Sequence, residues 1–271
     1  VATATASDAR AETSSEVGFV GKGDKVPNDV VRSKDSVARV QPLLEDLPEK
    51  HRLRIEFETA PRSTTGYDHD TRYVRQVTTV DATDKPDGPE VTYESWSGHA
   101  LRTATYQRGV QQGMEKNFNP KKGTLTVEIP WVNGKIEGVK RRFFPSGEVA
   151  SETPYRAGLV HGTSHTFDEA GKVIRAAEFS EGERHGSMTD YWRDNPEVVK
   201  QVVLYRKGKV DGTAEAFYLN GKPKWERPFK NNRQHGVETY YAGDGTVETT
   251  SYWLNGNRVP AEEYRKATGG E

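Results

Sequence analysis

The chain has 271 residues, of which 33% are hydrophobic, and its formal net charge is −1. Balanced charge argues against a nucleic-acid-binding or anionic-membrane class, and no apolar run approaches the roughly 20 residues that span a bilayer. The sequence has no cysteine, which excludes disulfides and thiolate metal sites. A compact globule usually has about 45–50% apolar residues, so we expect a thin architecture with a large surface.

Residues 1–50 are rich in Ala, Ser, Thr, Asp and Lys and contain only short apolar islands, such as Val37 to Leu47. This composition predicts an extended N-terminal arm of low hydrophobicity, held against the chain's own sheet or another subunit. Val1 followed by Ala-Thr-Ala-Thr-Ala-Ser is typical of a mature N-terminus after signal-peptide removal. We therefore expect export to the periplasm or cell envelope, with a cytoplasmic location as the alternative.

Residues 51–80 are interpreted as a non-repeat β segment that leads into a sheet. Strict alternation over residues 52–58 predicts a strand, and residues 72–80 predict another. The stretch between them contains Pro61 and Gly66, which predict a loop. Its Asp68-His69-Asp70 run has hard-ligand chemistry, but such short runs are common by chance.

Residues 81–260 contain a repeat, which is the strongest signal in the sequence. Two columns of aromatic residues recur at steps of 24 to 26 residues, and each second-column member follows its first-column partner by 12. A fixed period of this length is typical of a repeat array, in which most aromatics pack the array against itself. The first column is Tyr106, Trp131, Tyr155, Phe179, Tyr205, Phe229 and Trp253. The second column is Tyr93, Phe118, Phe143, Phe167, Tyr191, Phe217 and Tyr241.

Glycine recurs in three phases of the repeat, 3, 7 and 16 or 17 residues after each first-column aromatic. Where glycine is missing inside the array, asparagine replaces it, so these positions are predicted to need a positive φ. The turn residues assigned in this way include Gly138, Gly147, Gly162, Gly171, Gly186, Asn195, Gly212, Gly221, Asn232, Gly236 and Gly245.

The third glycine phase predicts a three-residue hairpin loop, as in Pro145-Ser-Gly147. With such a loop Phe143 opposes Val149, and simple alternation then places both aromatic columns on one face of the sheet. The predicted fold is therefore all-β: an elongated, single-layer antiparallel meander of about seven hairpin repeats of 24 residues, followed by a polar tail at residues 261–271. Inside the unit of 26 residues, the extra residues fall between Asn195 and Tyr205, where a longer turn is expected.

The repeat unit resembles the MORN repeat, and most closely the bacterial variant that reads Y-x-N-G-K-x-x-G…Y-Y-x-N-G. Trp131-Val-Asn-Gly-Lys-Ile-Glu-Gly138 and Phe217-Tyr-Leu-Asn-Gly-Lys222 carry the match, as does Tyr240-Tyr-Ala-Gly-Asp-Gly245. The resemblance covers roughly 180 residues and implies a β-hairpin array used for interaction. Some bacterial members are antitoxin components, and other MORN proteins are linked to membranes or to scaffold assembly.

Candidate chemistry is sparse. His161, His185 and His235 share one repeat phase, but adjacent repeats lie about 10 Å apart, too far for one ion, so we predict no metal site. Gly21-Lys-Gly-Asp-Lys25 lacks the spacing of a phosphate loop. A flat sheet offers no water-excluding pocket, so we predict no catalytic residues and no cofactor.

The leading hypothesis is a non-enzymatic scaffold or interaction subunit that docks on a larger assembly through its sheet and arm. Its partner would be a protein of unknown identity; we expect no nucleic acid and at most peripheral membrane contact. The alternatives are an antitoxin or immunity protein that inhibits a toxin enzyme, a membrane-lipid-binding protein and, least favoured, an enzyme acting on glycans.

Overall fold

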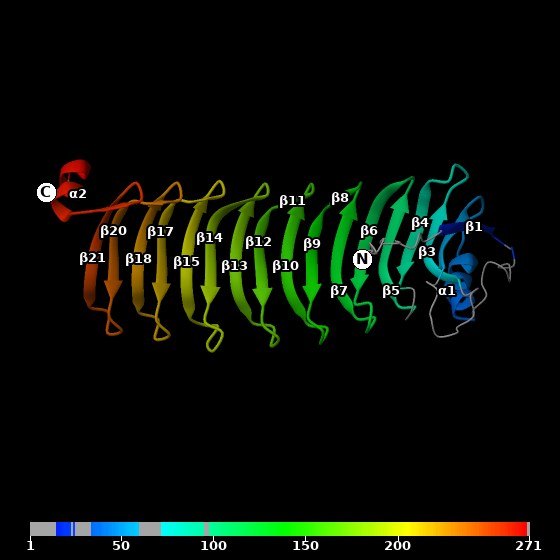
Figure 1. The fold of residues 1–271 in the computed structure, drawn as a ribbon, viewed down its shortest axis with the longest axis horizontal. Coiled ribbons are helices and arrows are strands. Elements are labelled where there is room, and N and C mark those ends of the chain that lie inside the picture. The colour runs from blue at the N-terminus through cyan, green and yellow to red at the C-terminus, as the bar shows by residue number, and fades with distance from the viewer. Residues whose placement is uncertain (1–14, 23, 25–33, 60–71, 95–97, 270–271) are drawn as a thin grey trace, which may run out of the picture. The chain divides into compact units, whose positions relative to one another are not determined.

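The computed structural model describes residues 15–22, 24, 34–59, 72–94 and 98–269. All 22 strands in these residues belong to one open antiparallel sheet that runs as a hairpin meander (Figure 1). The strands are β1 Ser15–Gly21, β2 Arg52–Thr59, β3 Arg72–Val80, β4 Pro86–Tyr93, β5 Ala100–Gln107, β6 Val110–Phe118, β7 Leu125–Val132, β8 Lys135–Ile136, β9 Gly138–Phe143, β10 Val149–Arg156, β11 Leu159–Val160, β12 Gly162–Phe167, β13 Val173–Ser180, β14 Glu183–Tyr191, β15 Val199–Arg206, β16 Lys209–Val210, β17 Gly212–Phe217, β18 Pro223–Lys230, β19 Arg233–Gln234, β20 Gly236–Tyr241, β21 Val247–Leu254 and β22 Asn257–Val259. The two helices are α1 Lys34–Glu45 and α2 Ala261–Thr268. The hairpin meander predicted from the repeat is therefore confirmed.

The chain divides into two compact units. The first contains residues 1–125 and 131–134, and the second contains residues 126–130 and 135–271. They are described separately.

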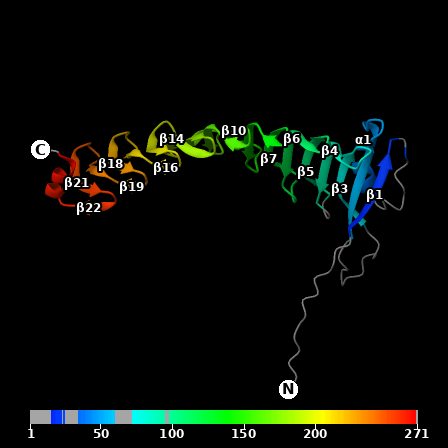
Figure 2. The same ribbon diagram turned by 90° about the horizontal axis from the view of Figure 1, so that it is seen from above.

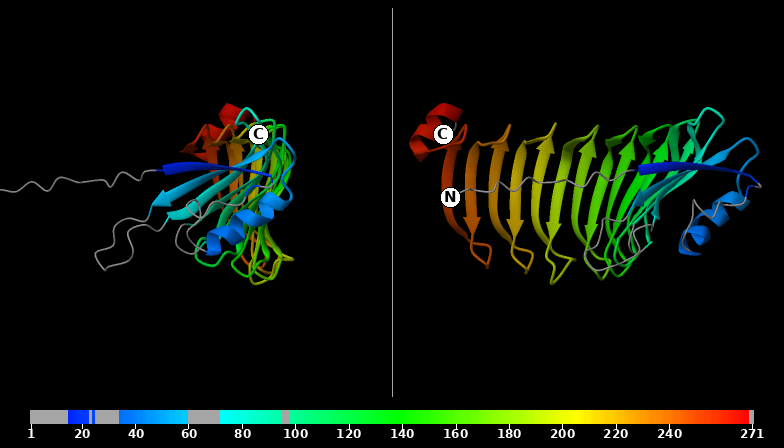
Figure 3. Two further views of the ribbon diagram at one scale, coloured as in Figure 1. Left: turned by 90° about the vertical axis from the view of Figure 1, so that its right-hand side faces the viewer. Right: turned by 45° about the vertical axis from the view of Figure 1, so that its right-hand side comes forward.

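The first unit has a conventional hydrophobic core where α1 lies against the N-terminal strands (Figure 3). Leu53 and Ile55 of β2 are fully buried, and they pack with Val40 and Leu44 of α1. The four-residue spacing of the two helix residues places them on one face, which is why this stretch forms a helix when a sheet is present to cover. The prediction of an extended arm over residues 1–50 is thus wrong for residues 34–45, which form α1. Amino-acid composition does not show that a sheet is present for this helix to pack against.

Other elements near the ends also bear on the sequence predictions. β2 and β3 occupy the residues where alternation predicted strands, whereas the predicted loop with Asp68-His69-Asp70 lies outside the described residues. The segment expected to be a polar tail begins with α2, which lies beside β21 and β22 (Figure 2). Its acidic first turn and basic last turn complement the helix dipole, and Tyr264 packs on Tyr252 with ring centroids 5.4 Å apart.

The predicted three-residue loop is confirmed in the second unit. Phe144 N–H donates to Glu148 C=O at 2.8 Å, and Gly147 closes the loop with φ +96°. At the other end of each hairpin, a two-residue loop has positive φ at both positions, as at Ala157 (+52°) and Gly158 (+89°). This is the type I′ geometry, whose twist matches the flanking strands.

The prediction that both aromatic columns share one face is wrong. Phe143 does pair with Val149, but the register then shifts, so that Arg142 pairs with Ser151 and Ala150 has no partner. Tyr155 lies on the same side of β10 as Ser151, which pairs with Arg142, and Phe143 follows Arg142 in β9 and so points to the opposite side. The bulge therefore places the first column on one side, called the first face, and the second column on the other, called the second face.

The positive-φ prediction holds at every assigned turn residue except one. Asn232 has φ +65°, and each assigned glycine is also positive. Asn195 is not among the residues with positive φ. It precedes Pro196, whose ring restricts the preceding residue to extended conformations, so asparagine here does not stand in for glycine.

The first unit also contains a polar network on its first face. Arg102 donates to Glu90 at 2.7 Å and to Glu115 at 3.1 Å, and both carboxylates are buried. Burial raises the pKa of Glu115, but hydrogen bonds from Arg102, Asn117 and Gln111 outweigh it, so the pKa lies below its usual value. The network therefore stabilises the fold most when Glu115 is ionised.

Truncating Leu53 to alanine should lower the free energy of unfolding by about 2–5 kcal/mol, because it leaves a cavity in the core under α1. Urea unfolding followed by circular dichroism measures this. The matched variant Leu219→Ala, at a site that is 49% exposed, should lower the free energy of unfolding by well under ~1 kcal/mol. Equal losses at both sites would contradict a core confined to the first unit's strands and α1.

Gly236→Ala should destabilise the protein more than Gly171→Ala, although both glycines have positive φ (+129° and +78°). A Cβ on Gly236 would lie 2.5 Å from Cγ of the rigid Pro228 ring, whereas one on Gly171 meets nothing within 4 Å. Thermal unfolding of the two variants measures the difference, and we expect the backbone cost alone, about 1 kcal/mol, at Gly171. A smaller loss at Gly236 would overturn this account of the glycine phase.

Glu115→Gln should lower the free energy of unfolding by about 1–3 kcal/mol at pH 7, because the ionised carboxylate accepts hydrogen bonds from Arg102 and two amides. A lowered folded-state pKa gives stability that is present above the unfolded value of about 4.3 and is lost as pH falls through the folded value. The difference between wild type and variant, measured by urea unfolding, should therefore shrink between about pH 5 and pH 3. A pH-independent difference would contradict it.

Candidate functional site

The repeat aromatics are partly exposed on both faces of the sheet. All fourteen are neither buried nor fully exposed. The repeats form one layer, and in the second unit the only described helix is α2, which packs beside β21. Across each strand pair the first-column ring faces a glycine, as Phe179 faces Gly162 and Trp253 faces Gly236. The rings therefore serve as packing elements and as accessible surface at the same time.

A group around Arg227 on the first face shows the packing role. The Arg227 guanidinium lies 4.4 Å from the centroid of Trp225 and 5.4 Å from that of Tyr240, and it pairs with the buried Glu238 at 2.6 Å. The second oxygen of Glu238 accepts a hydrogen bond from Trp253 Nε1 at 3.0 Å. Every charge in this group has a partner within it, so it stabilises the array.

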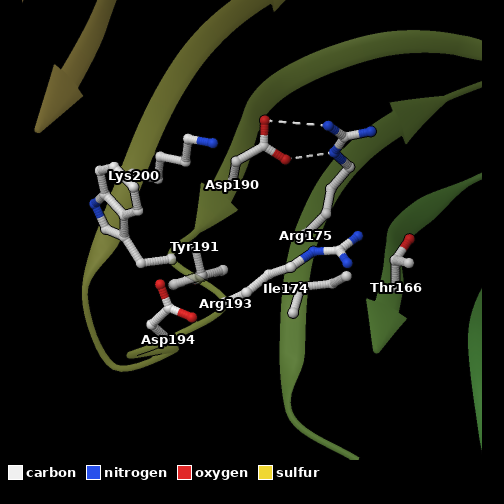
Figure 4. Close-up of a pocket in the computed structure, with 9 residues that line it drawn as sticks. Thr166, Ile174, Arg175, Asp190, Tyr191, Arg193, Asp194 and Lys200 are labelled. Carbon is white, nitrogen blue, oxygen red and sulfur yellow. Dashed lines mark hydrogen bonds and ion pairs between the residues drawn. The ribbon is translucent and has the colours of Figure 1, made fainter. Parts of the chain in front are cut away.

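A hollow of about 530 Å³ opens beside β13, β14 and β15. Figure 4 shows its lining, in which the paired Arg175 and Asp190 lie across the hollow from Arg193 and Asp194. The remaining lining residues are Thr166, Ile174, Tyr191, Trp192 and Lys200.

The hollow is located at the longest turn of the array. Trp192 N–H donates to Val198 C=O at 3.1 Å, and Val198 N–H donates to Asn195 C=O at 2.9 Å, which closes a turn longer than the three-residue loops. Because the register shifts after Asp190, Lys200 has no cross-strand partner. Its ammonium lies 5.1 Å from the Trp192 ring centroid, a cation–π contact beside the opening.

The charges of the hollow are unequally neutralised. Arg175 donates twice to Asp190, at 2.5 and 3.2 Å, and these bonds raise the pKa of Arg175 further above its usual value. Arg193 and Lys200 have no ion pair within the described part of the chain, and neither has Asp194. Trp192 Nε1 is buried without a hydrogen-bond partner among the described residues. The hollow thus offers cations, an indole and a hydroxyl to a bound group, which suits recognition.

Sequence reasoning missed most of this hollow. Of the assigned repeat residues only Tyr191 lines it, and the others are spread along the two columns. The available signal was the unit of 26 residues, whose extra residues and Asn195-Pro196 mark the longest turn. The residue pattern does not indicate the bulge at Lys200, whose ammonium contacts the Trp192 ring.

The histidine phase connects neighbouring turns. His235 Nδ1 accepts from Asn255 N–H at 3.3 Å, and Glu137 in the same phase accepts from Ala157 N–H at 2.6 Å. In the residues that the structure describes, no three His, Asp or Glu side chains gather as metal ligands. Over the same residues, no helix is long and apolar enough to cross a membrane. Gly21 N–H is bound to Asp24 at 2.8 Å, and the rest of that motif lies partly outside the described residues.

Comparisons with known proteins agree with the repeat. A family model described as "MORN repeat variant" matches residues 136–157 and 210–231. No curated protein matches the sequence. Similar solved structures include a crystal structure of a mutant of S. aureus TarM in complex with fondaparinux, α-GlcNAc-glycerol and UDP, and a crystal structure of TarM; both are 17% identical, with TM-scores of 0.27 and 0.28. They are matched over 44% and 49% of this chain.

The chain spans about a fifth of the length of those structures, 20% and 21%, and similarity at this level supports no inference about function. The match to the family model is stronger evidence about the repeat. It falls on two separate repeats, and both contain the three-residue loop, which ends at Gly147 and Gly221, and the assigned glycine seven residues after the first-column aromatic, Gly138 and Gly212. The chain therefore contains MORN repeats of this variant, matched at these two positions.

Proposed function

We propose that this chain is a non-enzymatic interaction protein, a scaffold or accessory subunit that docks on a larger assembly through the first face of its repeat sheet. The observation that supports this most directly is the hollow beside Trp192. It combines an indole, cations without an ion pair and a buried donor without an acceptor in the described part of the chain. Aromatic and arginine side chains in a hollow are the groups that most often anchor protein interfaces.

The lining favours binding over catalysis. The Asp190 carboxylate is held by two hydrogen bonds from Arg175, so it is poorly placed to accept a proton from a substrate. The lining has no histidine, and its one aliphatic hydroxyl, on Thr166, is the only aliphatic alcohol available as a nucleophile. Covalent chemistry would need a base that activates this hydroxyl, and in the described part of the chain no lining side chain forms a hydrogen bond with it.

The location and the identity of the assembly remain part of the proposal. We propose the cell envelope as its location, with the cytoplasm as the alternative. An antitoxin or immunity protein would use the same kind of surface against a single enzyme, so the two functions differ in their partner. The experiment below separates them by identifying that partner.

A photo-crosslinking amino acid, benzoylphenylalanine, placed at position 192 of the full chain should form one discrete adduct in the cells that naturally express the protein. Mass spectrometry of the adduct identifies the partner. Phe143 provides the matched control, because it is a second-column aromatic on the second face and does not line the hollow. We expect its adduct to be absent or much weaker.

Each outcome has a defined meaning. A discrete adduct with a structural or envelope protein would support the scaffold function. A discrete adduct with a toxin enzyme would support the immunity function in its place. No adduct at position 192, or equal adducts at both positions, would contradict docking through the first face.

A further inference from the structure

A second hollow, of about 490 Å³, lies at the edge of the sheet formed by the two-residue loops. Its lining consists of Lys209, Lys230, Asn231, Arg233 and Asn255. It contains three cations and no carboxylate, and it shares no residue with the hollow beside Trp192.

Hydrogen bonds between successive turns fix the backbone that carries these cations. Asn232 N–H donates to Val210 C=O at 2.8 Å, and Val210 N–H donates back to Asn232 Oδ1 at 2.7 Å. The next turn is joined in the same way, by Gly256 N–H to Gln234 C=O at 2.8 Å. Lys209, Lys230 and Arg233 therefore project from a rigid edge, although their side chains are exposed.

The three cations are not neutralised locally. Within the described residues none of them has a carboxylate within 4 Å, and the nearest ion pair at this edge joins Arg206 and Asp211 at 3.9 Å. The preceding turn has the opposite character, with Glu181 and Glu183 lining a separate hollow together with Lys207. The charge of the edge thus changes from mixed, with two carboxylates, to basic between one repeat and the next.

We propose that this edge binds an acidic segment of the partner protein, in an extended conformation. Successive turns are two strands apart, about 10 Å, which matches the roughly 9 Å between residues i and i+3 of a polyproline II helix. Acidic side chains at every third position can therefore reach Lys209 in one repeat and Lys230 or Arg233 in the next. The side-chain amides of Asn231 and Asn255, which have no hydrogen bond to the described residues, can pair with the peptide backbone.

The geometry favours a peptide over a polyanionic backbone or a lipid surface. The carboxylates of Glu181 and Glu183 lie at the adjacent turn and would repel an anion that continues along the edge. A short acidic segment that ends before that turn avoids the repulsion. This inference rests on the proposed interaction function and names the chemistry of one part of the partner.

Fluorescence anisotropy with a labelled peptide of repeated Glu-Pro-Pro triplets tests the inference on the full purified chain. The combined substitution Lys209→Glu, Lys230→Glu and Arg233→Glu should weaken binding by about tenfold or more at physiological salt, from the loss and reversal of three exposed ion pairs. The matched control is Lys121→Glu, Lys122→Glu and Lys172→Glu, which changes the net charge equally at exposed sites. It should stay within about twofold of wild type, since net charge alone acts weakly through salt.

Circular dichroism confirms that both variants remain folded. The inference would be overturned if both variants bound the peptide equally weakly or if the wild type did not bind it. It would also be overturned if a peptide with its glutamates clustered bound as tightly as the triplet peptide. A stronger effect of the edge substitutions on phosphatidylserine vesicles than on the peptide would overturn it too. The crosslink at position 192 is measured separately. If the crosslink forms but the peptide does not bind, the acidic-segment site is refuted and the proposed interaction function is not.

Discussion

Hydrogen bonds between neighbouring turns join the repeats of this protein, whose described residues form their hydrophobic core cluster in the first unit. In each repeat the second residue of the two-residue loop donates its N–H to a carbonyl of the previous repeat, as Gly158 does to Ile136 and Gly182 to Val160, both at 2.9 Å. The strand ladder and these turn contacts link each unit only to its neighbours, which makes stability a sum of local couplings. The glycine phase follows from this constraint, because the donating residue must adopt a positive φ.

A single layer has consequences for function. Both faces remain in contact with solvent, so an aromatic that packs the array is also available to a partner. Where the repeat is regular, charges and rings satisfy one another, as around Arg227. Where it departs from regularity, at the long turn after Trp192, cations remain without ion pairs and a hollow opens. The hollow beside Trp192 therefore coincides with the irregular repeat.

The first unit follows different physics. Its strands β2 and β3 bury Leu53, Ile55, Val74 and Val77 beneath α1, which is the usual arrangement of a helix on a sheet. This core anchors one end of the meander, and α2 packs beside β21 at the other end of the described strands. Repeat units cannot bury a face alone, so elements of this kind at the ends of an array limit fraying.

The sequence by itself determined the repeat, its period, the three-residue loop and nearly all positive-φ positions, because each depends on local backbone chemistry within one hairpin. It also determined the family, since the motif recurs in register. Only the tertiary structure decided which faces the two aromatic columns occupy, because an unpaired residue such as Ala150 reverses the alternation without changing the residue pattern. It likewise decided that residues 34–45 form a helix and that Lys200 meets Trp192, since both depend on surfaces supplied by distant strands. Local geometry is encoded locally, whereas the candidate site depends on register, and register is set by the pairing of whole strands.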